Sequence, residues 1–107
     1  MHWYTYVSYF FGGAFLANTI PHLGTGLAGR PFQSPFAKPP GKGLSSSSVN
    51  VLWGMLNLTI AWLLVCRVGC FDIHSAHNVL PVASGMLVMS LNLSYGFGRF
   101  HGGDLKG

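Results

Sequence analysis

Charged side chains are scarce in this sequence. The 107 residues include no Glu, only Asp72 and Asp104 as acids, and six Lys or Arg, so that 7% of the chain is charged. A soluble domain carries about 25% charged residues, which keep its surface hydrated and dispersed. The shortage disfavours a water-soluble fold, and it excludes catalysis by a pair of carboxylates.

Three long stretches lack any formal charge when His is neutral, namely residues 2–29, 43–66 and 73–98. A helix needs about 20 apolar residues to cross a hydrocarbon core of roughly 30 Å, so each stretch accommodates one crossing. No Lys or Arg precedes the first stretch and no A-x-A cleavage site follows it, which favours a retained helix over a cleaved signal peptide. The sequence predicts an all-α integral membrane three-helix bundle, with residues 1–107 as a single transmembrane domain.

Helix-breaking and capping residues set the expected bounds of these helices. We expect helices at about 3–20, 49–68 and 77–95, a Pro/Gly-rich loop at 21–48 and a short tail at 96–107. Pro21 lacks a backbone N–H and is expected to end or kink the first helix. The run of serines that begins at Ser45 offers N-caps for the second helix, and Gly96 and Gly98 are expected to break the third.

Basic residues are biased toward one side of the predicted membrane. The first loop contains Arg30, Lys38 and Lys42. The second loop and the tail balance their basic residues with an acid, as Arg67 with Asp72 and as Arg99 and Lys106 with Asp104. By the positive-inside rule, the N-terminus lies outside and the C-terminus in the cytoplasm, in a cell membrane such as the bacterial inner membrane. The scattered basic residues form no patch that would bind nucleic acid.

Small and polar residues recur at helical spacing in each predicted span. The expected helix-packing residues are Gly12, Gly13, Ala17, Asn50, Gly54, Asn57, Gly85 and Asn92. Lipid tails are as apolar as Leu, so membrane helices associate through close backbone approach at small residues and through interhelical hydrogen bonds. Asn57 and Asn92 fall near the middle of their helices and are expected to face protein. The alternative is that they line a polar path for a substrate or ion.

Four potential metal ligands follow one another at the outer end of the second helix: Cys66, Cys70, His74 and His77. Thiolate and imidazole groups suit zinc or copper, although the spacing matches no common zinc motif. The simpler interpretation makes the cysteines small hydrophobic residues or a disulfide, and the histidines headgroup-level side chains.

His22 and His101 are expected at the cytoplasmic interface. His22 with Asn18 one turn earlier suggests a histidine base and a substrate-orienting amide. The simpler interpretation is a histidine at a helix end that reaches toward water.

These observations favour a structural or accessory subunit, or a homo-oligomeric scaffold, in a membrane complex. Its expected partners are the lipid bilayer and other membrane helices, from copies of itself or from a larger complex. The alternative is a transporter-like protein, or one that handles a metal or small molecule through the outer Cys/His group. The absence of Asp and Glu from the spans weighs against proton-coupled transport. Enzyme activity and a cofactor are not expected, with a metal ion as the alternative.

Overall fold

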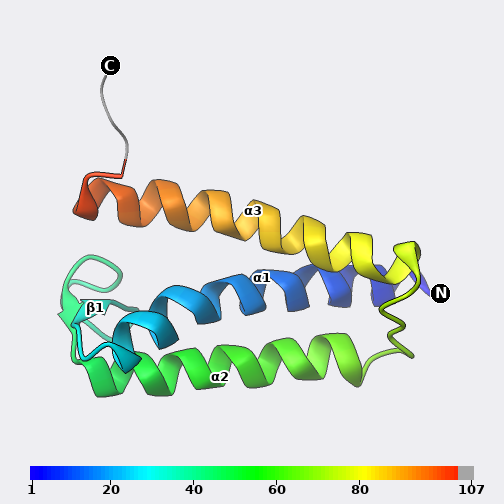
Figure 1. Cartoon of the computed structure of the whole chain (residues 1–107), viewed down its shortest axis with the longest axis horizontal. Helices are drawn as coiled ribbons and strands as arrows, with labels where there is room; N and C mark the ends of the chain where they lie inside the picture. Colours follow the sequence, from blue (N-terminus) through cyan, green and yellow to red (C-terminus); the bar gives the residue numbers. More distant parts are fainter. Residues whose placement is uncertain (104–107) are drawn as a thin grey trace.

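The computed structural model describes residues 1–103 and contains three helices in the order α1 (Trp3–Leu27), α2 (Ser47–Cys66) and α3 (Ala76–His101). Two short strands, β1 (Phe32–Gln33) and β2 (Leu44–Ser45), lie between α1 and α2. The all-α prediction is confirmed. The helices lie side by side with α1 in the middle, because α1 packs against both neighbours whereas α2 and α3 barely touch (Figure 1).

The first helix continues past Pro21, so the expected end at residue 20 is wrong. Helix α1 runs to Leu27 with Pro21 inside it. Close packing on α2 holds the segment after the proline, since a Cβ on Gly26 would meet the Ser47 carbonyl and a Cβ on Gly54 would meet the backbone of Leu23. The Thr25 hydroxyl also donates to the Pro21 carbonyl at 2.5 Å, which satisfies an acceptor within the last turns.

Helix α2 begins at Ser47 and ends at Cys66, two residues earlier at each end than expected. Ser46 is its N-cap, and its hydroxyl accepts a hydrogen bond from the Val49 N–H at 3.3 Å. This bond satisfies one of the amide groups that have no partner within the first turn of a helix.

The third helix also extends beyond its expected bounds, because Gly96 and Gly98 do not break it. Helix α3 ends at His101, and Gly102 follows with a positive φ of 70° and donates its N–H to the Gly98 carbonyl. A glycine in the left-handed region is a common helix terminator, since it has no Cβ to clash there. The predicted tail at 96–107 is therefore helical to His101, and residues 104–107 lie outside the described part of the chain.

The loop between α1 and α2, residues 28–46, contains a small antiparallel sheet that the sequence did not predict. Phe32 pairs with Ser45 and Gln33 pairs with Leu44. The Ser34 and Ser45 hydroxyls lie 2.5 Å apart beside this pairing and are buried. We call this folded segment the loop cap, because it lies over the C-terminal end of α1 and the N-terminal end of α2 (Figure 1).

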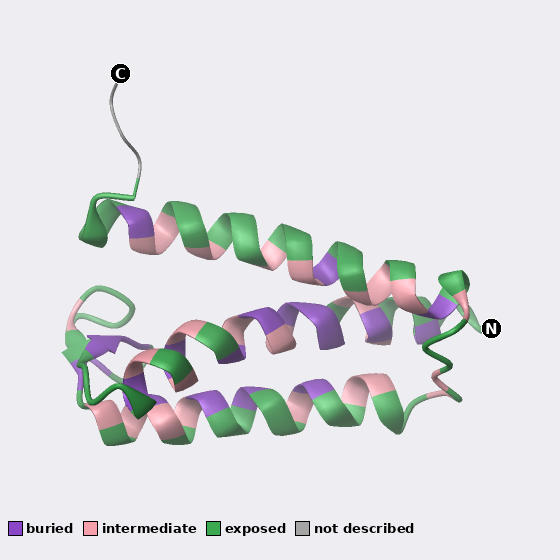
Figure 2. Cartoon of the chain, viewed as in Figure 1, coloured by how far each residue is buried: buried purple, intermediate pink, exposed green. Residues whose placement is uncertain are grey.

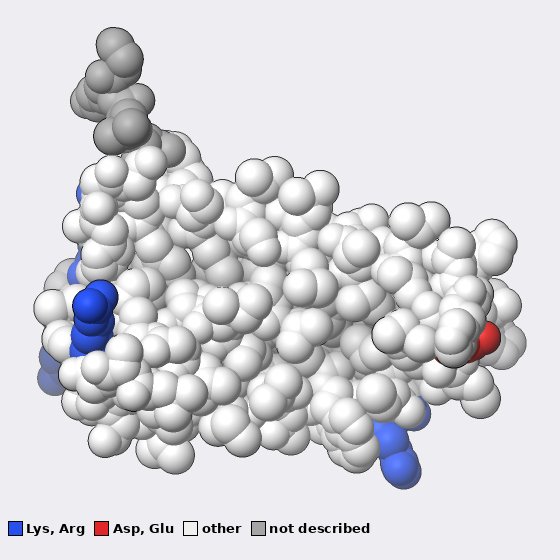
Figure 3. Space-filling model, in the orientation of Figure 1, with Lys and Arg blue, Asp and Glu red and all other residues white. Residues whose placement is uncertain are grey.

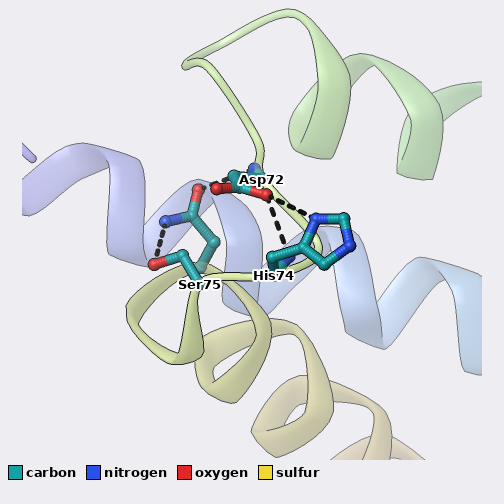
Figure 4. Close-up of polar contacts among 4 residues, drawn as sticks. Asp72, His74 and Ser75 are labelled. Carbon is teal, nitrogen blue, oxygen red and sulfur yellow. Dashed lines mark hydrogen bonds and ion pairs between the residues drawn. The ribbon is translucent and has the colours of Figure 1, made fainter.

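The turn between α2 and α3 is organised by Asp72 and Asn78. The Asp72 carboxylate accepts a hydrogen bond from the backbone N–H of His74 at 2.9 Å (Figure 4). The backbone N–H of Asp72 donates to Asn78 Oδ1 at 3.2 Å. Asn78 Nδ2 donates to the Ser75 hydroxyl at 3.1 Å. Ser75 is the N-cap residue of α3, but its side chain makes no cap hydrogen bond to the helix.

Glycines allow α1 to approach both neighbours. A Cβ on Gly12 would meet Val65 of α2. A Cβ on Gly13 would meet the Val82 carbonyl of α3, and a Cβ on Gly85 would meet the Phe10 carbonyl of α1. Adjacent glycines on α1 therefore face opposite neighbours, which explains how one helix packs closely against two.

Burial follows this central position of α1. Its buried residues extend along most of its length, whereas α3 buries only Asn78, Gly85 and Gly98 (Figure 2). Apart from the Tyr9 ring, the most buried side chains are small or polar, and large hydrophobic side chains such as Leu52 and Leu80 are exposed at 70% and 61%.

Charged side chains lie toward the two ends of the helices. On the face drawn in Figure 3, the atoms of Lys, Arg, Asp and Glu lie toward the two ends, and none lies over the middle of the molecule. We call the loop cap and the C-terminal turn of α3 the loop end, and the N-terminus and residues 67–75 the turn end. The loop end carries Arg30, Lys38, Lys42 and Arg99.

Helices α2 and α3 are each long enough and apolar enough to cross a membrane, judged by length and composition. Among residues 1–103, α1 does not meet the same criterion, although its 25 residues exceed the roughly 20 that a crossing needs. Its Gly, Thr and Tyr residues make it less apolar, and many of them face the other two helices.

Gly85→Ala should separate α1 from α3. The added Cβ collides with the Phe10 carbonyl, a backbone atom that cannot move aside alone, so we expect a loss of about 1–3 kcal/mol in the free energy of unfolding. Gly96→Ala is the matched control on the same helix, because a Cβ there meets nothing within 4 Å. It should stabilise α3 by up to about 1 kcal/mol through helix propensity. Thermal unfolding in detergent, followed by circular dichroism, measures both, and equal effects would contradict the packing described.

Candidate functional site

Two pairs of polar side chains connect α1 to α2 inside the molecule. Asn18 Nδ2 donates to Asn57 Oδ1 at 2.9 Å, and His22 Nδ1 lies 2.8 Å from Asn50 Oδ1. Asn18 and His22 are one turn apart on α1. Their partners Asn57 and Asn50 are two turns apart on α2, in reverse chain order because the two helices are antiparallel. Asn50 and Asn57 are 0% exposed and His22 is 2% exposed, so each hydrogen bond replaces one that water would have made.

Asn50 is the centre of the more elaborate pair. Its Nδ2 group donates to the carbonyls of Phe32 and Ser46, both at 3.1 Å, and lies 3.3 Å from the Ser45 carbonyl. The amide therefore joins the start of α2 to both strands of the loop cap. A buried amide that reaches three carbonyl oxygens has one orientation only, with its own oxygen toward His22.

The orientation of Asn50 determines the tautomer of His22. Asn50 Oδ1 is an acceptor, so His22 Nδ1 must carry a proton and donate it. In the neutral imidazole, Nε2 then holds a lone pair and is free to accept a hydrogen bond or bind a ligand. The site thus contains a buried base whose reactive nitrogen is fixed by its neighbour.

Aromatic rings surround His22. The rings of Phe32, Trp53 and Phe97 lie edge-on to the imidazole, with centroids 5.7, 6.2 and 5.9 Å away. These rings come from the loop cap, α2 and α3 respectively. Edge-on contacts between rings are favourable and directional, so all three elements fix the position of the imidazole.

The C-terminal turn of α3 is attached to the same region. His101 Nε2 lies 2.9 Å from Gln33 Oε1, and the His101 ring stacks on Phe32 at 5.3 Å with an interplanar angle of 8°. Phe97 adds a ring contact with Phe32 at 4.6 Å. Phe32 therefore lies between the two histidines, edge-on to His22 and stacked on His101.

A pocket of about 170 Å³ lies where these elements meet. Its polar lining residues are Asn18, His22, Gln33, Ser34 and Trp53, and its other lining residues are Pro35, Gly41 and Phe97. The Trp53 indole N–H is buried and has no hydrogen-bond partner among the described residues. We call this the His22 pocket. Its lining includes His22, whose Nε2 holds a lone pair, and Trp53, whose buried N–H is unused, and it has no charged residue within residues 1–103.

Seven of the eight predicted packing residues lie between helices. Gly12, Gly54, Asn50 and Asn57 face the α1–α2 contact, Gly13 and Gly85 face the α1–α3 contact, and Ala17 is buried at 3% exposure. Asn92 is exposed on α3, where its Nδ2 donates only to the Val88 carbonyl of its own helix at 2.8 Å. The chain leaves Asn92 exposed because α3 turns only one side toward α1, and the expectation that Asn92 faces protein stays a prediction.

The structure does not assemble the predicted metal ligands Cys66, Cys70, His74 and His77. Both cysteines are free and exposed, and His74 Nδ1 lies 3.3 Å from the Asp72 carboxylate, where both side chains are exposed. No three His, Cys, Asp or Glu residues within residues 1–103 come close enough to hold one metal ion. The four positions spread from the end of α2 across the turn to the start of α3, so the chain direction changes between them.

The pairing of Asn18 and His22 with α2, and the roles of Gln33 and Ser34, are absent from the sequence predictions. One signal was present in the spacing. Asn18 and His22 are four residues apart on α1, and Asn50 and Asn57 are seven residues apart on α2, so each pair lies on one helix face. Two antiparallel helices with such faces are able to align them, whereas nothing in the sequence brings the loop to α2.

Comparison with protein-family models, curated proteins and solved structures found no match to this chain.

Asn50→Leu should release the loop cap while keeping a side chain of similar size. The His22 N–H and the carbonyls of Phe32 and Ser46 would lose their buried partner, so we expect a loss of roughly 3 kcal/mol in stability. Trypsin cleavage of the loop is expected after Lys42, because Arg30 and Lys38 are followed by proline, which blocks cleavage at those two residues.

Cleavage after Lys42 in detergent should accelerate at least several-fold in this variant. Thr59→Leu also replaces a polar side chain by leucine, at an exposed position of α2, and is expected to leave the cleavage rate unchanged. A loop that is equally resistant in both variants would contradict the role assigned to Asn50.

Proposed function

We propose that this chain is an integral membrane protein with three spans, and that it acts as a structural or accessory subunit by associating with further membrane helices. The observation that carries the proposal is the reversed distribution of polarity. The interior contains Asn50, Asn57 and His22, while the outer surfaces of α2 and α3 present large apolar side chains. In water this arrangement would be unfavourable on both counts, whereas in lipid it satisfies both.

Helix lengths and charge positions support the same conclusion. The shortest helix has 20 residues and rises about 30 Å, which matches the hydrocarbon core. The charged residues of the described chain lie at the loop end and the turn end, outside the apolar middle (Figure 3). We assign α1 as the third span although it is less apolar, because its neighbours shield both of its polar sides from lipid.

The distribution of basic residues gives the orientation within this proposal. Arg30, Lys38, Lys42 and Arg99 lie at the loop end, whereas the turn end has Arg67 beside Asp72. The loop end is therefore cytoplasmic and the N-terminus is outside, in a cell membrane such as the bacterial inner membrane. Asp104 and Lys106, which also entered the sequence-based assignment, lie outside the described residues.

The open face of α3 supports association. Leu80, Leu87 and Leu91 lie on it with exposed fractions of 61%, 60% and 63%, and Asn92 is exposed about 100° around the helix from Leu91. Asn92 lies within about one turn of the middle of α3, and its Oδ1 would face lipid in a monomer. A carboxamide oxygen in hydrocarbon favours pairing with a donor on another helix.

The partner we favour is a second copy of this chain. A carboxamide carries both a donor and an acceptor, so two Asn92 side chains complement each other across a two-fold axis. Ala83 and Ser84, about two turns before Asn92 along α3, are exposed as well, and small side chains allow the backbones of two helices to come close.

Topology is testable with the two native cysteines. Cys66 and Cys70 are both exposed at the turn end, so a membrane-impermeant maleimide should label the wild-type protein in intact cells. A Lys42→Cys variant in which both native cysteines are replaced by Ser should be labelled only after the cells are permeabilised. The reverse pattern would overturn the orientation, and extraction of the protein by alkaline carbonate would overturn membrane insertion.

Asn92→Leu should weaken self-association. Loss of the interhelical amide pair is expected to lower the dimer association constant by about threefold to twentyfold, since such bonds contribute about 0.6–1.7 kcal/mol. Thr59→Val is the matched control, because Thr59 is exposed on α2 and donates to the Met55 carbonyl of its own helix. Cross-linking and native mass spectrometry in mild detergent measure the dimer fraction. A wild-type protein that is strictly monomeric and purifies without a partner would overturn the subunit role.

A further inference from the structure

We propose that the His22 pocket binds the ring of a membrane-soluble quinol, that is, a hydroquinone with an apolar tail. This goes beyond the structural role, and it rests on the proposed membrane insertion, because such a ligand reaches the pocket from the bilayer. The proposal is built on four features of the pocket: its hydrogen-bonding groups, its walls, its lack of charge and its apolar surroundings.

The hydrogen-bonding groups of the pocket match a hydroquinone. His22 Nε2 holds a lone pair because Asn50 fixes the proton on Nδ1, and Asn18 uses its Nδ2 for Asn57 and retains Oδ1 as an acceptor. The buried Trp53 N–H is a donor without a partner among the described residues. A hydroquinone offers O–H donors to the two acceptors and an oxygen lone pair to the indole. A quinone offers acceptors only.

The walls and volume select a single flat ring. His22, Trp53 and Phe97 present rings from all three helices, and such surfaces suit contact with another aromatic ring. The pocket volume of about 170 Å³ is below the roughly 300–1,000 Å³ of sites for drug-sized molecules. One substituted ring fits a volume of about 170 Å³, whereas a fused sterol nucleus does not.

The lining also excludes charged lipid headgroups. None of its residues is Lys, Arg, Asp or Glu within the described chain, so neither a phosphate nor an ammonium group would find a counter-ion there. Burying an unpaired charge is costly, which leaves neutral ligands.

An apolar groove adjoins the pocket at Trp53. It has a volume of about 380 Å³ and is lined by Phe36, Val49, Leu52, Trp53 and Leu56 on the outer side of α2. Trp53 lines both the groove and the His22 pocket. An amphipathic ligand with its polar ring in the pocket thus finds an apolar surface for its tail at the same residue.

The test compares three ligands on the wild-type protein in lipid nanodiscs by titration calorimetry, with empty nanodiscs as the baseline for partition into lipid. The probes are a decyl-substituted benzoquinol, the corresponding quinone and the O,O-dimethyl ether of the quinol. We expect saturable binding of the quinol, with the ether about tenfold weaker because it has no O–H to donate. The quinone should also bind more weakly than the quinol, since it offers acceptors only and leaves His22 Nε2 and Asn18 Oδ1 without a donor.

Two variants locate the site. Trp53→Phe keeps a ring and removes the N–H, and should weaken quinol binding by about tenfold. Trp62→Phe on the same helix is the matched control and should bind the quinol as the wild-type protein does. His22→Asn retains an N–H for Asn50 and removes Nε2, and should weaken binding at least as much. Resistance of Lys42 to trypsin in this variant verifies that the loop cap is intact.

Quinol heats equal to those of empty nanodiscs, or equal affinities of the quinol and its ether, would overturn the proposal and leave the pocket to water. So would identical binding by Trp53→Phe and Trp62→Phe. These failures are distinct from failure of the proposed function, because cysteine labelling and carbonate extraction establish membrane insertion separately. A correctly inserted protein that binds no quinol loses the ligand only.

Discussion

The hydrogen bonds between α1 and α2 are the interaction on which the rest of the structure depends. Asn18 with Asn57 and His22 with Asn50 fix the register of the two helices, since each amide or imidazole has a single partner across the contact. Asn50 then binds the carbonyls of the loop cap, and the loop cap carries the Phe32 ring against His22 and His101. Release of one amide would disturb helix register, loop position and the attachment of α3 together.

Close packing supplies the second constraint, and it acts on α1 from two sides. Gly12 admits α2 and Gly13 admits α3, so the middle helix has little room for large side chains. Its interior positions are consequently filled by small or polar groups, while the two outer helices carry the large apolar side chains outward. The lower apolarity of α1 follows from its position and is consistent with a span shielded by its neighbours.

The sequence predicted what depends on composition and local periodicity. The charge deficit and the three uncharged stretches predicted three helices. The spacing of small residues predicted Gly12, Gly13, Gly54 and Gly85 as packing positions, and each lies at a close contact between helices. Helix ends were less predictable. Pro21 and Gly96 normally interrupt helices, but tertiary contacts of Gly26 with α2 and of His101 with Gln33 hold the chain helical beyond them. The His22 pocket depends on a loop returning to α2, a long-range event without a local signal.

The two proposed interactions meet on α3, where Asn92 and Phe97 line one further pocket together with Gly41 of the loop cap. Asn92 is exposed, whereas Phe97 turns inward to the His22 ring at 5.9 Å. Between the Gly85 crossing and the His101 contact, α3 lies against α1 along one side only. A partner helix at Asn92 would therefore press α3 toward α1 and lie close to Gly41 and Phe97, which also line the His22 pocket. Association and ring binding would then be coupled through these two residues, because each stabilises the same position of α3.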